Sequence, residues 1–519
     1  MTMVGGVPTS REAGRRRAPR VAVVGAGMSG ICAAAKLAAV GVDDVVVYEK
    51  ADRVGGTWRE NTYPGLSCDI PSRYYCYTFA PNPDWTHVYP PGAEVQAYFE
   101  KVVDDLGIRR RIRFGAEIEE AVWTDRSTWL VRTRGGDAAE YDFLISAAGV
   151  LHHPRMPDIR GLETFEGAAF HSARWDHGVP LDGRRVGVVG TGSTGVQITK
   201  ALAPRCRRYK LFQRTPQWVF PLANLPYQPW TRWLLRRSPA LNRWWGRRAY
   251  RFWQSIFEST FCMAVIAPGW QRNLVSALCR LNLRSVRDPR LRRRLRPKDR
   301  PMCKRMVIAA GFYRALRHEG AELVDQPIDH VEPRGIVTAD GRLHELDVIV
   351  LATGFHAHSY LRPVELVGPG GLRLSEVWQD EPRAYRTVAL PGFPNFFLLL
   401  GPHSPIGNQS LFTITETQID YAVQWIERWR GGEFTAAMPH QDAADRFNDE
   451  MRAAYPRTIW VSGCDSWYLG KDGLPALWPW SPQTHRSMLA TPRLDEWQLE
   501  RNGASATAAP RDRSAAGGP

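Results

Sequence analysis

The sequence predicts an α/β protein with two Rossmann-like nucleotide-binding domains, and three observations support this prediction. The 519 residues are enough for two to four structural units, each with its own buried core. Residues 21–50 and 185–215 follow the same order: an apolar strand, a glycine-rich turn, a helix and a second apolar strand. The hydrophobic content of 44% and the charged content of 23% are those of an ordinary globular protein.

Each of the two turns contains the pattern GxGxxG, which is a weak signal when it occurs alone. Here both copies follow a strand and open a helix, as a dinucleotide-binding fingerprint requires. The first glycine allows a tight turn, the second lets the backbone approach a pyrophosphate, and the third lets helix and strand pack closely. The glycines are Gly25, Gly27 and Gly30 in the first copy and Gly190, Gly192 and Gly195 in the second, with Thr191, Ser193 and Thr194 between them. Two copies predict two bound dinucleotides.

The residue that follows the second strand distinguishes the two units. In the first unit it is Glu49, whose carboxylate can accept hydrogen bonds from both hydroxyls of an unmodified ribose, as in FAD or NAD. The matching place in the second unit holds Arg214 followed by Thr215, and a guanidinium suits a ribose 2′-phosphate. We therefore expect FAD in the first unit and NADPH in the second. The alternative for Arg214 is a solvated charge at the end of a strand.

Two further apolar strands, 141–150 and 346–355, end in small residues and glycine. In a flavin-disulfide-reductase-like arrangement such strands return the chain to the FAD domain, so that the NADPH domain is inserted in a discontinuous FAD domain. The expected parts are a disordered basic N-terminus (1–19), the first part of the FAD domain (20–155), a linker (156–180), the NADPH domain (181–335) with a helical insertion (224–300), the second part of the FAD domain with a C-terminal lid loop (336–500), and a disordered tail (501–519).

The net charge of +15 arises from 68 basic and 53 acidic residues. It is explained by solvated basic faces, with an anionic ligand or membrane surface as the alternatives. Nucleic acid is not expected, because zinc-finger, basic-zipper and RNP patterns are missing. The eight cysteines form no CxxC pair and no cluster with metal-ligand spacing, which predicts a reducing, cytoplasmic location, no metal and no disulfide redox pair. No apolar run reaches about 18 residues, so no membrane span is expected.

Two longer motifs resemble the fingerprints of one family. Residues 55–69 read GGTWRENTYPGLSCD and match [AG]GxWxxxx[FY]P[GM]xxxD. Residues 165–176 read FEGAAFHSARWD and match FxGxxxHxxxW[PD]. Over residues 20–490 the chain resembles the class B flavoprotein monooxygenases, and within them the type I Baeyer–Villiger monooxygenases. The Trp175–Asp176 ending favours these over the related flavin-containing monooxygenases, which oxidise nitrogen and sulfur.

The resemblance implies a role for specific residues. Asp69 would hold Arg305, Arg305 would stabilise a negatively charged C4a-peroxyflavin, and His171 would influence NADPH binding and domain movement; these three are the catalytic candidates. Residues expected at FAD, beside the first glycine turn and Glu49, are Gly56, Thr57, Trp58, Asp69, Ile70, Tyr75, Ile118 and Asn408. Residues expected at NADP, beside the second turn, Arg214 and Thr215, are Lys304, Arg305 and Trp467, the last of them in a mobile lid.

The predicted function is therefore an NADPH- and O2-dependent flavoprotein monooxygenase that converts a ketone to an ester or lactone. The aromatic lid and insertion suggest a large hydrophobic ketone. An N- or S-oxygenating or hydroxylating flavin-containing monooxygenase is the alternative, and a cofactor-binding module without activity is a third. The sequence does not predict the oligomeric state.

The insertion at 224–300 is the least standard segment. Residues 230–257 contain seven Arg and five Trp and no acidic residue. Apolar residues at 241, 245, 249, 252 and 256 follow helical spacing. We expect helices that cap the substrate cavity. Peripheral contact of residues 230–257 with anionic lipid is the alternative.

Overall fold

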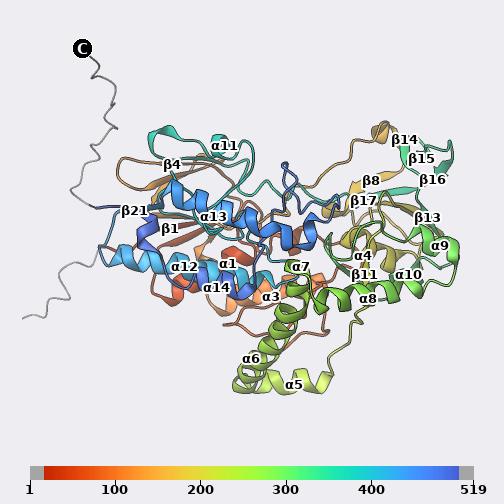
Figure 1. Ribbon diagram of the computed structural model, residues 1–519, viewed down its shortest axis with the longest axis horizontal. Helices are drawn as coiled ribbons and strands as arrows, with labels where there is room; N and C mark the ends of the chain where they lie inside the picture. The colour runs from red at the N-terminus through yellow and green to blue at the C-terminus, as the bar shows by residue number, and fades with distance from the viewer. Residues whose placement is uncertain (1–16, 502–519) are drawn as a thin grey trace, which may run out of the picture.

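The computed structural model describes residues 17–501 (Figure 1). Two α/β bodies lie side by side, and each is built around a five-stranded parallel sheet. The predicted disordered ends, 1–19 and 501–519, fall almost entirely outside the described residues. Within residues 17–501 no helix is both long and apolar enough to span a membrane.

The first sheet forms the core of the FAD domain. The central strand β1 (Val21–Val24) pairs in parallel with β2 (Val45–Tyr48) on one side and β7 (Phe143–Ser146) on the other. The edge strands are β3 (Ile112–Arg113) and β19 (Phe396–Leu398). Because β19 comes from the C-terminal part of the chain, the FAD domain is discontinuous, as predicted.

Helix α1 (Met28–Ala39) starts directly after the first glycine turn, and its small residues let it lie close to the sheet. A Cβ on Gly30 would lie 1.8 Å from the carbonyl oxygen of Gly25, so only glycine allows this approach. The opposite side of α1 packs against α12 (Leu411–Arg430). The first glycine turn is thereby fixed between a buried strand and a buried helix.

The second sheet repeats the plan around the second glycine turn. Its order is β13 (Ala321–Val324), β10 (Arg208–Phe212), β9 (Arg185–Val189), β17 (Val348–Leu351) and β8 (Ala168–His171). Helix α4 (Ser193–Leu202) follows β9, and a Cβ on Gly195 would lie 2.0 Å from the carbonyl oxygen of Gly190. The two units therefore share one local geometry.

The predicted domain boundaries differ from the structure at three places. The strand at 346–355 was expected in the FAD domain, but β17 pairs with β9 and β8 in the second sheet. Residues 336–345 were also expected in the second part of the FAD domain, but they belong to a meander of β14 (Ile328–Glu332), β15 (Gly335–Thr338) and β16 (Leu343–Glu345) that precedes β17. The linker at 156–180 likewise contributes β8. The NADPH domain thus extends over about 168–351, because pairing with distant strands and not local composition sets its limits.

Smaller elements complete the FAD domain. A four-stranded sheet contains β18 (Glu365–Val367), β4 (Ile118–Trp123), β5 (Trp129–Thr133) and β6 (Ala138–Tyr141), and a hairpin-like pair contains β20 (Ala436–Pro439) and β21 (Trp497–Glu500). The main additional helices are α2 (Thr57–Glu60), α3 (Gly92–Asp105), α11 (Leu374–Val377), α13 (Gln441–Ala454) and α14 (Pro482–Met488).

The insertion is helical, as predicted. It lies between β11 (Val219–Phe220) and β12 (Val307–Ile308) and contains α5 (Pro229–Arg237), α6 (Pro239–Ile256), the π-helical turn η4 (Phe257–Cys262), α7 (Met263–Ile266), α8 (Trp270–Arg284) and α9 (Pro289–Arg294). Helices α5 and α6 form a hairpin that extends away from both domains, at the bottom of Figure 1.

The face that α6 buries is not the apolar stripe that the sequence indicated. Its fully buried residues are Asn242, Gly246 and Tyr250, one position beyond Leu241, Trp245 and Ala249. The amide of Asn242 donates to the carbonyl oxygen of Pro81 at 2.9 Å, and a Cβ on Gly246 would lie 2.8 Å from the Pro81 side chain. Close backbone approach to the FAD domain therefore orients the helix, and much of its apolar stripe faces outward.

Candidate active site

A large cavity of about 1360 Å³ is lined by both glycine turns. This volume exceeds the ~300–1,000 Å³ of a typical single-ligand site, as two dinucleotides and a substrate require. Almost all of the predicted site residues line it: Gly25, Gly27, Glu49, Gly56, Thr57, Trp58, Asp69, Ile70, Tyr75, Ile118, Asn408, Gly190, Thr191, Gly192, Ser193, Thr194, Arg214, Thr215, Lys304, Arg305 and Trp467. Gly30 and Gly195 lie behind the turns, where they allow the close packing described above.

The backbone around the first glycine turn fits a pyrophosphate group. Gly25 has φ of 97°, a left-handed conformation that favours glycine, and a Cβ there would lie 2.9 Å from the carbonyl oxygen of Ala147. A Cβ on Gly56, in the second loop, would lie 3.1 Å from the Cα of Gly27. No side chain lies between the two loops where they meet, so their backbone amides are accessible to an anion at the start of α1.

Glu49 lies directly after β2 and is almost completely buried. Its carboxylate accepts hydrogen bonds from the backbone amides of Ala26 at 2.8 Å and Ala51 at 3.0 Å. Arg59 of α2 forms an ion pair with the same carboxylate at 2.9 Å. These contacts fix the carboxylate at the cavity wall, where a ribose on the first unit would lie.

The matching position in the second unit carries a free cation. Arg214 is exposed, lines the cavity two residues beyond β10, and forms no ion pair with any residue in the range 17–501. The hydroxyl of Thr191 donates to the carbonyl oxygen of Thr215 at 2.6 Å and so ties the glycine turn to this strand end. On Gly192 a Cβ would meet no atom within 4 Å, so the turn opens into the cavity. A phosphate on the ribose would complete this site.

Between the two turns, Arg305 and Asp69 form a close ion pair. The Nη2 and Nε of Arg305 donate to the same oxygen of Asp69, at 2.6 Å and 3.2 Å. The negative charge of Asp69 raises the pKa of Arg305 above its ordinary value, so the guanidinium stays charged. Both residues line the cavity; the Arg305 side chain is 42% exposed and that of Asp69 is 19% exposed, so the guanidinium is the more accessible of the two.

The neighbouring lysine and tryptophan take other partners. Lys304 lines the cavity and pairs with Asp299 at 2.8 Å. On the opposite wall the indole of Trp58 donates to the hydroxyl of Tyr75 at 3.0 Å. Asn408 also lies in the wall, but its amide nitrogen donates to the backbone of Phe261 at 3.3 Å, so its geometry does not single it out as a cofactor contact.

His171 does not line the cavity, which corrects its place among the catalytic candidates. It is 3% exposed at the end of β8, and its Nδ1 accepts a hydrogen bond from the amide of Ala173 at 3.1 Å. Its ring packs edge-on against Phe355, which follows β17, with centroids 5.8 Å apart. Burial lowers the pKa of His171, so the imidazole stays neutral. The fingerprint histidine therefore packs against the end of the neighbouring strand in its own sheet, outside the cavity lining.

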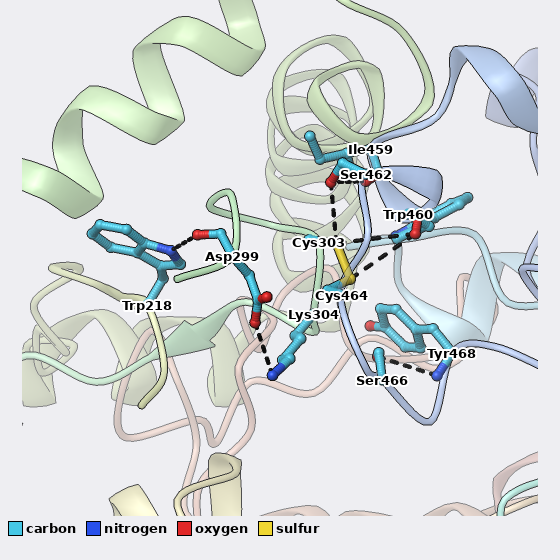
Figure 2. The surroundings of a disulfide bond; sticks show 10 residues. All are labelled: Trp218, Asp299, Cys303, Lys304, Ile459, Trp460, Ser462, Cys464, Ser466 and Tyr468. Atoms are coloured by element: carbon cyan, nitrogen blue, oxygen red, sulfur yellow. Dashed lines mark hydrogen bonds and ion pairs between the residues drawn. A yellow bond between two sulfur atoms is a disulfide. The ribbon is translucent and has the colours of Figure 1, made fainter. Parts of the chain in front are cut away.

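The loop 463–482, which was predicted to act as a lid and is called the lid loop below, is joined to the segment that carries Arg305 (Figure 2). Cys303, two residues before Arg305, forms a disulfide with Cys464. Three and four residues after Cys464 come Trp467 and Tyr468, which both line the cavity with their rings 4.5 Å apart. No sequence motif indicates this disulfide, because its two cysteines are 161 residues apart and form no CxxC pair.

A carboxyl pair anchors the far side of the lid loop. Glu381 and Asp472 both lie 3.7 Å from Nη2 of Arg452. Burial, followed by the contact with Asp472, raises the pKa of Glu381 to about 7. A Cβ on Gly470 would lie 2.4 Å from Glu381, so the loop backbone rests directly on this carboxyl. The raised pKa leaves the Glu381 carboxyl partly protonated near neutral pH.

Sequence reasoning missed several residues of this site. Tyr63 donates to the side chain of Gln197 at 2.9 Å, and Gln197 donates to the backbone of Ser67 at 2.9 Å, which links α4 to the loop that carries Asp69. Tyr63 occupies the aromatic [FY] position of the first fingerprint, so the motif itself could have identified it as a site residue. His152 belongs to neither fingerprint, yet it lines the cavity, and burial lowers its pKa to about 4.

The insertion reaches the cavity only through Phe257 among residues 224–300, so the expected cap is limited to this one side chain.

Known proteins resemble this chain in sequence and in fold. Residues 23–90 match the family described as NAD(P)-binding Rossmann-like domain. An uncharacterized monooxygenase of Mycobacterium tuberculosis is 54% identical over 94% of this chain and 97% of its own. A Baeyer-Villiger monooxygenase of Streptomyces coelicolor is 36% identical over 93% of each chain. The crystal structure of OTEMO in complex with FAD and NADP aligns with a TM-score of 0.83 and 28% identity, covering 93% of this chain and 99% of that one. The chain belongs to the Baeyer–Villiger monooxygenases.

Proposed function

We propose that this protein converts a large hydrophobic ketone to an ester or lactone, with the ion pair of Arg305 and Asp69 at the reacting centre. The chain is an NADPH-dependent flavin monooxygenase that acts on ketones. The observation that carries the finer proposal is a charged guanidinium in the wall of a cavity lined by both glycine turns, held there by a neighbouring carboxylate.

FAD and NADPH fit the two turns. The start of α1 and Glu49 would hold the pyrophosphate and ribose of FAD, and the start of α4 with Arg214 would hold those of NADPH. When bound, FAD accepts a hydride from NADPH and activates O2, so that one oxygen atom enters the substrate and the other leaves as water.

The residues of the chain supply position and electrostatics. Asp69 prevents Arg305 from turning out of the cavity, and the fixed positive charge stabilises negative charge that develops on oxygen during the reaction. Donors that are already oriented need no rearrangement at that moment, which is why the ion pair behind Arg305 matters. Trp467 and Tyr468 cover the same place and exclude water, which would otherwise divert the reaction to hydrogen peroxide.

The substrate class is inferred from the apolar groups at the wall. The cavity lining includes the apolar or aromatic side chains of Phe257, Leu411, Trp467, Tyr468 and Leu477. A ketone with a large hydrophobic body would bury against these side chains, while its carbonyl carbon would meet the reacting oxygen. A small polar ketone would leave them exposed to water.

The test is product analysis with a series of ketones of increasing size and one thioether of similar bulk. We expect NADPH-dependent ester or lactone formation that becomes more efficient with substrate size. Efficient sulfoxide formation without any ester would instead favour the N- or S-oxygenating alternative. A purified protein that takes up no FAD would overturn both.

A further inference from the structure

The α5–α6 hairpin carries a basic and aromatic surface that no part of the described chain covers. We call it the Arg/Trp surface. It consists of Trp230, Trp233, Leu234, Arg237, Arg243, Trp244, Trp245, Arg247, Arg248, Arg251 and Phe252. Figure 1 shows that the two helices extend from the body of the molecule, so that the hairpin tip and its outer faces are sterically accessible.

The aromatic side chains of this surface are unusually exposed. Trp230 is 65% exposed, Trp233 55%, Trp244 47%, Trp245 46% and Phe252 58%. Leaving such rings in water costs free energy, and contiguous exposed apolar groups mark a surface that meets a partner. The inward face of α6 is occupied by Asn242, Gly246 and Tyr250, so rotation of the helix cannot bury these rings.

The arginines of the surface have no carboxylate partner within residues 17–501. Two of them lie over indole rings instead: the guanidinium of Arg237 is 4.5 Å from the centre of Trp233, and that of Arg248 is 5.0 Å from the centre of Trp244. Arg236, which lies outside the surface as defined, does pair with Asp84. An ion pair is thus formed on the inner side of the hairpin, and uncompensated charge remains on the outer side.

We propose that the Arg/Trp surface docks the protein on an anionic lipid bilayer. Tryptophan rings prefer the headgroup region, where the ring body is apolar and the indole N–H finds a partner. Arginines on the same helices attract anionic headgroups, and an amphipathic helix with both features lies in the plane of the interface. The proposal does not rest on the proposed ketone chemistry, since no residue of the surface lines the cavity.

A second copy of the chain fits the surface less well. An isologous contact would bring the arginines of one α6 against those of the other, and no acidic residue lies in 230–257 to compensate them. An anionic bilayer satisfies both the charge and the apolar rings at once.

The experiment is co-sedimentation of the full chain, loaded with FAD, with vesicles of phosphatidylcholine alone and of phosphatidylcholine with about one third phosphatidylglycerol. We expect binding to the anionic vesicles that weakens with added salt, and little binding to the neutral ones. Each neutralised arginine should lower partition about fivefold, so Arg247→Gln/Arg248→Gln/Arg251→Gln together should lower it about a hundredfold.

The matched control removes three exposed arginines from the other end of the insertion: Arg290→Gln/Arg293→Gln/Arg296→Gln. It lowers the net charge by the same amount and should bind anionic vesicles nearly as well as the wild type. Equal loss in both triple variants would overturn the proposal, because net charge alone would then explain adsorption. So would a wild-type protein that stays in the supernatant at low salt.

A third variant, Trp244→Ser/Trp245→Ser, tests the aromatic part. It should release the protein from anionic vesicles while FAD content and NADPH consumption without vesicles stay unchanged. A dimer in sedimentation velocity that this variant dissociates, without any effect on vesicle binding, would assign the surface to a second copy and refute lipid docking.

Discussion

Replacing Asp69 by alanine tests whether the carboxylate acts by fixing Arg305. Two N–H groups of Arg305 meet one oxygen of Asp69, at 2.6 Å and 3.2 Å. A hydrogen bond to a charged group contributes about 1.5–3 kcal/mol, and removal of a donor that stabilises developing negative charge costs about 2.7–4 kcal/mol of barrier. Asp69→Ala leaves the guanidinium present but free to move. We expect a loss of about 2–3 kcal/mol, or roughly a 30- to 150-fold slower ester formation.

The assay follows three quantities in one reaction: NADPH consumed, ester formed and hydrogen peroxide released. Neither glycine turn contacts the altered carboxylate, so the variant should still bind FAD and consume NADPH. The missing ester should therefore appear as peroxide. Asp182→Ala is the matched control, because it removes the carboxylate of an exposed pair with Arg205 that is far from the cavity lining.

A double-mutant cycle decides the mechanism. If Asp69 acts through Arg305, then Asp69→Ala combined with Arg305→Ala should be no worse than Arg305→Ala alone. Additive losses would refute this reasoning, since they would mean that the carboxylate has a separate role. Ester formation by Asp69→Ala at the wild-type rate would refute it as well.

Three further predictions address the cofactor, the disulfide and the lid. Arg214→Ser should weaken NADPH more than NADH in steady-state kinetics, because only NADPH carries the 2′-phosphate; equal losses would contradict the assignment. Cys303→Ser with Cys464→Ser should lower stability by about 2–5 kcal/mol and increase peroxide release, measured by denaturation and by product ratio; an unchanged ratio would show that the lid holds its place without the bond. The pKa of Glu381 is raised to about 7, so this carboxyl binds more protons in the folded than in the unfolded protein. The free energy of unfolding should therefore fall as the pH rises from about 4.5 to about 7. After allowance for partial solvent exposure, we expect a fall of about 1–2 kcal/mol. Glu381→Gln should flatten this dependence in thermal unfolding, and a variant that keeps the wild-type slope would exclude the Glu381 carboxyl as its source.

The glycine turns were predictable because their geometry is local. Gly25 needs a left-handed backbone, and a Cβ on Gly30 would clash with a carbonyl oxygen. Both requirements concern a few consecutive residues, so the glycine pattern in the sequence reveals them. Glu49 and Arg214 were found for the same reason, since each follows a strand at a fixed distance from its turn. The ion pair of Arg305 with Asp69 joins residues 236 apart and was predicted only through family resemblance.

Other features could not be derived from local patterns. The strand β17 is as apolar as a strand of either sheet, and only its pairing with β9 shows which one it joins. The apolar stripe of α6 predicted the wrong buried face for two reasons. An apolar stripe on a helix need not pack against its own chain, and α6 is rotated so that Gly246 can approach Pro81. The bond between Cys303 and Cys464 depends on the position of a lid whose sequence is irregular.

These non-local features act together at Arg305. Its side chain is held by Asp69, which belongs to the FAD domain, while the backbone two residues earlier is bonded through Cys303 to the loop that carries Trp467 and Tyr468. If the lid loop moves, we expect the disulfide to transmit the movement to the segment that holds the cation, while the Asp69 carboxylate opposes displacement of the guanidinium. If both restraints operate, their loss should not be additive in peroxide release: once Asp69 is removed, breaking the disulfide should add little, because the cation is already free. The ratio of ester to peroxide in the combined variant therefore shows whether the disulfide and Asp69 act on the same position of the guanidinium.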